Sequence, residues 1–176
     1  QEKAPESAGH MERSLLHDTL TTDWRLDAAD RMDILATPDH VGDVWLEGSL
    51  LLDAPVGGLG FRLDGAGNGY FVEVQPGSST VLLKKLLPMQ RDSGQQWFRY
   101  VELQRGDLSH PPRRGDTMRF RLILSGPYIE CSLDGEVVLA TLSAERLSGR
   151  VGIWAESGSI AAIEPQWSPL RPLRHG

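Results

Sequence analysis

The chain has 176 residues, of which 40% are hydrophobic and 24% are charged, enough for one domain with a proper core. The net charge of -6 argues against a nucleic-acid-binding surface, because neutralising phosphates requires a basic patch. No apolar run approaches the length of a membrane span, and the single cysteine, Cys131, can form no internal disulfide.

The two ends of the chain lack any hydrophobic period. Residues 1–13 are polar, and we expect them to form a flexible linker or the remnant of a cloning tag. Residues 171–176 form a second polar tail. We therefore expect one folded domain over residues 14–170.

Alternating apolar and polar residues predict about a dozen short strands between turn signals. Residues 15–22 suit either a first strand or an irregular lead-in, and residues 142–147 form the only short stretch that could be helical. In chain order, the expected strands cover residues 24–28, 32–36, 43–53, 58–64, 70–75, 80–87, 95–104, 117–125, 128–133, 136–141, 149–156 and 159–167.

The organising stretch is residues 57–87, which predicts three strands joined by two tight turns. Successive side chains of a strand point to opposite faces, so Leu59, Phe61 and Leu63 are expected inward and Arg62 on the far face. In the next strand, Phe71 and Glu73 are expected on that far face. Asp64, beside the glycine-rich turn, could cap the turn instead of touching a ligand.

Regularly spaced short strands without a long helical period predict an all-β fold. We expect an antiparallel β-sandwich or jelly roll, in which every second residue of each strand contributes to the core between two sheets.

Three segments within residues 57–87 resemble the concanavalin A-like, laminin G-like jelly rolls: GFRLD (60–64), GNGYFVEV (67–74) and TVLLK (80–84). LDGE (133–136) and LSGRVGIWA (147–155) are also typical of that group. The resemblance covers roughly residues 15–170. Within the group, the chain is most similar to the family 66 carbohydrate-binding modules and the C-terminal sandwich of family 32 fructan hydrolases, and the 3-keto-disaccharide hydrolase domain is a competing neighbour.

The resemblance implies a sandwich that binds the end of a fructan-like chain on behalf of an attached hydrolase. Sugar sites combine hydrogen-bonding groups with an aromatic platform. We expect the strand residues that point away from the core to supply such groups. Arg62, Glu73 and Arg121 are expected to form hydrogen bonds with one terminal sugar, and Trp97 or Trp154 to stack on it. The predicted carbohydrate-binding residues are Glu47, Arg62, Glu73, Trp97, Arg121, Glu130 and Trp154.

A solvated sheet face with cross-strand Glu–Arg pairs is the simpler explanation of the same pattern. Trp24 and Trp167 lie near strand ends and are expected in the core or at its rim. Any two of Glu47, Glu73 and Glu130 could supply the two carboxylates of a glycosidase, but any sheet with outward glutamates offers such pairs.

We expect no required cofactor and no catalytic residue. A structural calcium is the one metal considered, with Asp30, Asp33 and Glu164 as candidate oxygen ligands. The expected partners are a carbohydrate and a catalytic domain in the parent chain, with no nucleic acid and no membrane. The expected location is extracellular or periplasmic. The alternatives are a hydrolase or lyase domain acting on a keto-disaccharide, and a structural sandwich that packs on a catalytic domain.

Overall fold

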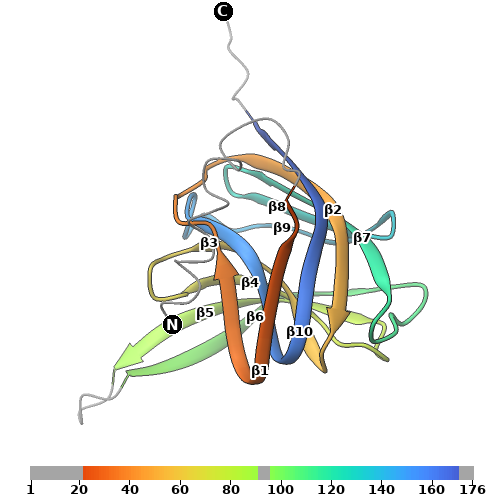
Figure 1. Cartoon of the computed structure of the whole chain (residues 1–176). Helices are drawn as coiled ribbons and strands as arrows, with labels where there is room; N and C mark the ends of the chain where they lie inside the picture. Colours follow the sequence, from red (N-terminus) through yellow and green to blue (C-terminus); the bar gives the residue numbers. More distant parts are fainter. Residues whose placement is uncertain (1–21, 91–95, 171–176) are drawn as a thin grey trace, which may run out of the picture.

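The computed structural model describes residues 22–90 and 96–170, and it describes the side chains of residues 22–86 and 99–170. The predictions for residues 1–13 and 171–176, and for a strand at residues 15–22, therefore lie outside the described residues. The described part is all-β and antiparallel (Figure 1). Its strands are β1 (Trp24–Ala36), β2 (Val44–Asp53), β3 (Val56–Leu63), β4 (Gly69–Val74), β5 (Thr80–Gln90), β6 (Gln96–Asp107), β7 (Thr117–Ser125), β8 (Tyr128–Leu133), β9 (Glu136–Leu142) and β10 (Arg150–Pro169).

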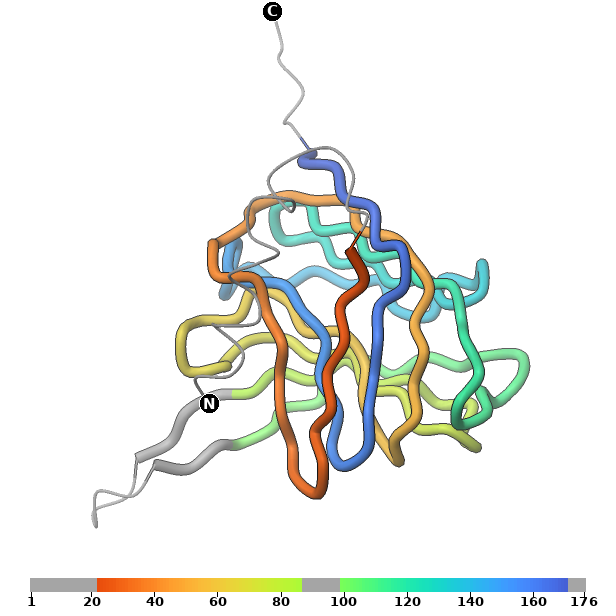
Figure 2. Tube along the Cα trace, viewed as in Figure 1, coloured from red at the N-terminus to blue at the C-terminus, as the bar shows by residue number. Residues whose placement is uncertain are grey.

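The hydrogen-bonded path runs β6-β5-β4-β3-β10-β2-β7-β8-β9, and β1 pairs with β10. β10 pairs with β3 through residues 150–156 and with β2 through residues 159–169. β1 follows β10 through the same bend, with Ala29 opposite Gly158. The two bends lie together in Figure 2, and they fold one continuous sheet into two layers.

The first layer contains β6, β5, β4, β3, residues 150–156 of β10 and residues 32–36 of β1. The second layer contains residues 24–27 of β1, residues 159–169 of β10, β2, β7, β8 and β9. Their outer edges also meet, because the Gln104 side chain of β6 bonds both the backbone N–H and the carbonyl of Ala140 in β9.

The core lies between the two layers, as the alternation predicts. β2 and β7 bury every second residue, so that Leu46 and Leu50 lie opposite Leu122 and Met118 across one ladder. Tyr70 and Phe61 stack in the opposite layer with ring centroids 5.2 Å apart. The sandwich prediction is confirmed, and Trp24 and Trp167 are buried in this core at 1% and 3% exposure, as expected.

Two pairs of expected strands are continuous in the structure. The turns predicted near Ala29 and at Ser157-Gly158 are bends inside β1 and β10, where Ala29 has φ 56 and Ser157 has φ 61. Backbone pairing continues on both sides of each bend, so twelve expected strands become ten among the described residues.

The helical alternative for residues 142–147 is wrong. Leu142 ends β9, and the segment that follows is irregular. Its backbone and side chains are engaged across the end of the sandwich: Arg62 Nη1 donates to the Arg146 carbonyl, and Lys85 forms an ion pair with Glu145. Ser143 Oγ lies 2.5 Å from the Tyr70 hydroxyl. These contacts hold the irregular segment across the end of the sandwich.

The expected parity fails at the end of β3. Arg62 has a left-handed backbone with φ 51, and the register with β10 shifts between Gly60 and Leu63. Such an irregularity reverses the alternation. Arg62 is fully buried, whereas Leu63 lies in a second apolar cluster on the outer side of the first layer. The expectations that Leu63 points into the main core and Arg62 away from it are both wrong.

Within residues 22–90 and 96–170, no helix is long and apolar enough to cross a membrane.

A substitution at Gly152 would test how closely β1 packs against β10. A Cβ there would lie 2.0 Å from the Leu35 carbonyl oxygen and 2.7 Å from Ala36 Cα, both backbone atoms that cannot rotate away. We expect Gly152→Ala to lower the free energy of unfolding by about 1–3 kcal/mol or more in chemical denaturation. Gly42→Ala is the matched control, because a Cβ at Gly42 meets nothing within 4 Å. Equal stability of the two variants would contradict the β1–β10 packing described above.

Candidate functional site

The predicted sugar-binding residues do not converge on one face. Glu47, Arg121 and Glu130 lie on the outer side of the second layer, because their neighbours of opposite parity form the core. Glu73 and Trp154 lie on the outer side of the first layer. The side chain of Trp97 lies outside the described residues. The expected single site is therefore divided between two surfaces that the core separates.

Arg62 belongs to neither surface. Its side chain is 0% exposed, and Nη1 donates to the carbonyls of Gly126 at 2.7 Å and Arg146 at 3.0 Å. Nη2 lies 3.6 Å from the carboxylate of Asp43. Burial lowers the pKa of Arg62, and the charge of Asp43 opposes that effect. The expectation that Arg62 faces a ligand is wrong, because this guanidinium ties β3 to the loops at one end of the sandwich.

Asp64 caps the glycine-rich turn. Its Oδ1 accepts hydrogen bonds from the backbone N–H of Ala66 at 2.8 Å and of Asn68 at 3.0 Å. Arg146 Nη2 lies 3.2 Å from Oδ2. The capping interpretation of Asp64 is confirmed.

The outer side of the first layer curves around a cluster that we call the Tyr100 face. It is formed by Tyr100, Lys84, Glu73, Glu156 and Met32 above a floor of Phe71, Trp154, Leu63 and Leu86. β6 and β1 are the two edges of this layer, and a flat sheet would separate them by roughly 24 Å. The Tyr100 hydroxyl nevertheless lies 4.0 Å from the Met32 sulfur, so this side of the sheet is concave.

A carboxylate and an ammonium form the polar centre of the Tyr100 face. Lys84 Nζ donates to Glu73 Oε1 at 2.9 Å, and Gln75 Nε2 donates to Glu73 Oε2 at 3.1 Å. The same ammonium lies 5.0 Å from the centre of the Tyr100 ring, a cation–π contact. Because Glu73 is only 8% exposed and bonded at both oxygens, its carboxylate is fixed in position.

Tyr100 is the exposed aromatic of this face, at 50% exposure. Burial of its other half raises the pKa of the phenol, the charge of Lys84 lowers it, and Glu156 and Glu73 raise it further, with a net upward shift. The hydroxyl is therefore protonated at neutral pH and can donate a hydrogen bond.

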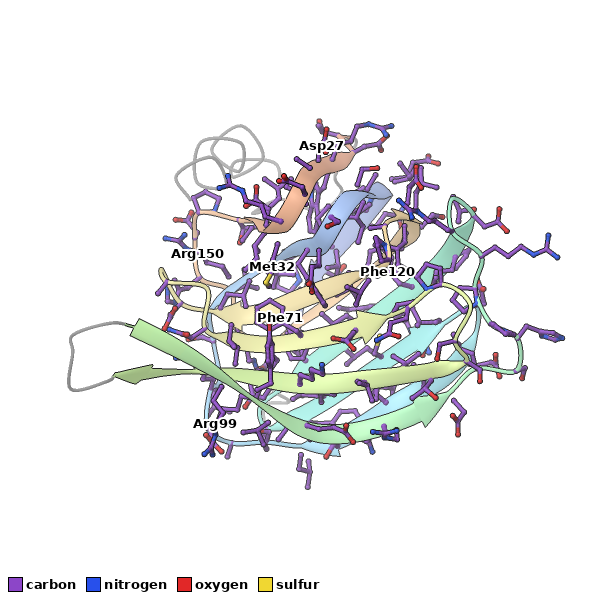
Figure 3. The ribbon with its side chains drawn as sticks, turned by 90° about the horizontal axis from the view of Figure 1, so that it is seen from below. Asp27, Met32, Phe71, Arg99, Phe120 and Arg150 are labelled. Carbon is purple, nitrogen blue, oxygen red and sulfur yellow. The ribbon has the colours of Figure 1, made fainter. Side chains whose placement is uncertain are left out.

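The floor is aromatic but covered. Trp154 is 4% exposed, meets Phe71 edge-on at 5.7 Å and donates its indole N–H to the Val72 carbonyl at 3.1 Å. Met32 and Phe71, labelled in Figure 3, lie beside each other on this side of the sheet. Trp154 thus supports the face from below, and the ring that a ligand can reach is Tyr100.

Tyr100 and Lys84 were not among the predicted site residues. Each lies in a predicted strand, but nothing in a single sequence fixes how one strand is aligned with the next. The register that places Lys84 opposite Phe71, and Leu86 opposite Tyr100, supplies that alignment.

The outer side of the second layer carries a second polar group, which we call the Arg121 face. Glu47, Arg121 and Ser132 lie opposite one another on β2, β7 and β8. Arg121 Nη2 lies 3.8 Å from Glu130, whose other oxygen accepts a 2.6 Å hydrogen bond from the Tyr128 hydroxyl. Two small pockets of about 180 and 130 Å³ open here, and Glu47 and Arg119 line both.

The described residues contain no group of three or more His, Cys, Asp or Glu side chains that could hold a metal ion. Asp30, Asp33 and Glu164 therefore do not assemble the calcium site considered from the sequence.

No family model matches the chain, and no curated protein matches it in sequence. Solved structures share its fold. The carbohydrate-binding module CBM66 from Bacillus subtilis superposes with a TM-score of 0.64 at 14% identity, over 84% of this chain and 92% of that one.

Two further structures are similar. A fructosyltransferase from A. japonicus matches with a TM-score of 0.57 at 12% identity, over 89% of this chain but only 27% of that enzyme. A candidate glycosyl hydrolase from Parabacteroides distasonis ATCC 8503 matches with a TM-score of 0.51 at 11% identity, over 78% of this chain and 76% of that one. At these identities the comparisons establish the concanavalin A-like β-sandwich fold.

Arg62→Met tests whether this guanidinium is structural. The variant keeps most of the buried volume but leaves the Gly126 and Arg146 carbonyls without their donor. We expect the free energy of unfolding to fall by about 2–4 kcal/mol in urea denaturation. Arg25→Met, at a side chain that is 65% exposed, should change it little. An Arg62→Met variant as stable as the parent would show that these bonds do not hold the sandwich end.

Asp64 predicts a dependence of stability on pH. Burial acts to raise its pKa, but hydrogen bonds from Asn68 and Ala66 and the charge of Arg146 outweigh that effect, so the folded pKa lies below the ordinary value. The stabilisation is therefore complete above about pH 4 and is lost as pH falls through the folded pKa. Asp64→Asn should flatten the fall in unfolding free energy below about pH 4. Parallel pH curves for the two proteins would contradict this assignment.

Proposed function

We propose that the chain is a non-catalytic carbohydrate-binding module whose ligand lies on the Tyr100 face. The observation that carries the proposal is the half-exposed Tyr100 ring beside the fixed Glu73–Lys84 pair on a concave sheet. A sugar offers hydroxyls that need donors and acceptors, together with a C–H face that stacks on an aromatic ring. This face supplies both within one cluster.

Each polar group has a defined part in the proposal. Lys84 has three N–H donors and uses one on Glu73, so it can donate another to a sugar hydroxyl. Tyr100 provides the stacking surface and a donor hydroxyl, and Glu156, exposed on the neighbouring part of the face, can accept from the ligand. Glu73 fixes Lys84 and need not contact the sugar.

The ligand we propose is the terminal residue of a fructan-like chain. An end residue fits a concave cluster with a single accessible ring better than an internal segment, which needs an open path on both sides. We further propose that the module serves an attached glycoside hydrolase outside the cell or in the periplasm. The fold it shares with a carbohydrate-binding module and with part of a fructosyltransferase supports this context.

A binding role is favoured over hydrolysis by the positions of the glutamates. Glu73 lies on the opposite side of the core from Glu47 and Glu130, so it can form a catalytic pair with neither. Both of its oxygens are already bonded to Lys84 and Gln75. Glu130 is likewise held by Tyr128.

Isothermal titration with fructose, sucrose, levan and inulin tests the proposal, with glucose- and galactose-based sugars for comparison. We expect saturable heat with a fructan, and an affinity at least about tenfold weaker in Tyr100→Ala because stacking is lost. Lys84→Ala should weaken it similarly. Trp45→Ala is the matched control, since it removes a 40%-exposed aromatic from the other layer.

No heat with any of these sugars would overturn the proposed function. If fructan binding were lost in Trp45→Ala but kept in Tyr100→Ala, the sugar would bind on the second layer, and the proposed site on the Tyr100 face would be wrong. Heat that continues as slow turnover would favour the hydrolase alternative and direct attention to the glutamates.

A further inference from the structure

The Arg121 face holds hydrogen-bond donors that the protein does not use. Ser132 is 4% exposed, and its hydroxyl has no hydrogen-bond partner among the described residues. The buried Nε of Arg121, directly opposite on β7, has none in the same part of the chain. Buried donors without partners are rare in folded proteins, because leaving them unsatisfied is unfavourable.

Both donors belong to residues that line one pocket of about 180 Å³, together with Glu47, Arg119, Phe120 and Gly135. Glu130 does not satisfy Arg121, since the 3.8 Å separation is too long for a hydrogen bond and Tyr128 occupies its other oxygen. Arg119 adds a second guanidinium, so the pocket lining carries two positive charges and one negative charge in a protein whose net charge is -6.

We propose that this pocket binds the carboxylate of an acidic sugar, a hexuronate residue. A carboxylate only accepts hydrogen bonds, and its two oxygens match the planar fork of an arginine. Ser132 would donate a further bond to it. Glu47, which also lines the pocket, would accept from a ring hydroxyl, which favours a sugar acid over a simple anion.

The proposal is independent of the Tyr100 face, because the core lies between the two surfaces. A chain that binds no fructan could still bind uronate here, and the reverse also holds. At about 180 Å³ the pocket is below the range of about 300–1,000 Å³ typical of drug-sized ligand sites, so the proposed ligand is no larger than one sugar ring.

The test is isothermal titration of the chain with galacturonate and, as the matched neutral sugar, galactose. We expect galacturonate to bind at least about tenfold more tightly than galactose, and less tightly as salt is raised. Ser132→Ala and Arg121→Lys should each weaken galacturonate binding about fivefold or more. Tyr100→Ala and Arg105→Gln, an exposed arginine of the first layer, should leave it unchanged.

Thermal unfolding of Ser132→Ala provides a second readout. Removing an unsatisfied buried hydroxyl should leave the melting temperature unchanged or raise it, so the variant tests binding in a folded protein. Equal affinity for galacturonate and galactose, no binding of either, or unchanged galacturonate affinity in a folded Ser132→Ala would each overturn the proposal.

Discussion

The joint bend of β1 and β10 determines the architecture of the described domain. These strands are hydrogen-bonded neighbours, so neither can turn without the other unless their ladder breaks. Ala29 and Gly158 lie opposite each other in left-handed conformations, and the pair passes together from one layer to the other. This shared turn encloses the core and leaves two outer sheet faces that no ligand could bridge.

The fold could be predicted from the sequence because a half-buried strand imposes a period of two. β2 and β7 follow that period without interruption, and the predicted placement of Glu47, Arg121 and Glu130 outside the core is correct. The same logic failed at Arg62, where one residue with positive φ reverses the parity. An arginine in a strand is expected at the surface, and its sequence neighbours do not reveal the buried carbonyls that bind it.

The candidate site could be predicted only in part. The alternation along a strand shows which side chains point away from the core, but it does not show which of the two layers the strand belongs to. Glu73 and Arg121 share a parity and lie on opposite sides of the molecule. The cluster around Tyr100 depends on two registers and on the curvature of the first layer. The two outer faces differ in chemistry: the Tyr100 face is internally bonded, whereas the Arg121 face keeps free donors.

Sugar binding at the Tyr100 face can be observed residue by residue in ¹H–¹⁵N NMR spectra of the labelled chain titrated with a short fructan oligosaccharide. We expect chemical-shift changes to concentrate on the backbone of β4, β5 and β6 near Glu73, Lys84 and Tyr100 and on the indole N–H of Trp154, while the Trp45 indole signal stays unchanged. Shifts centred on Trp45 and the strands of the second layer, or none at saturating sugar, would contradict it.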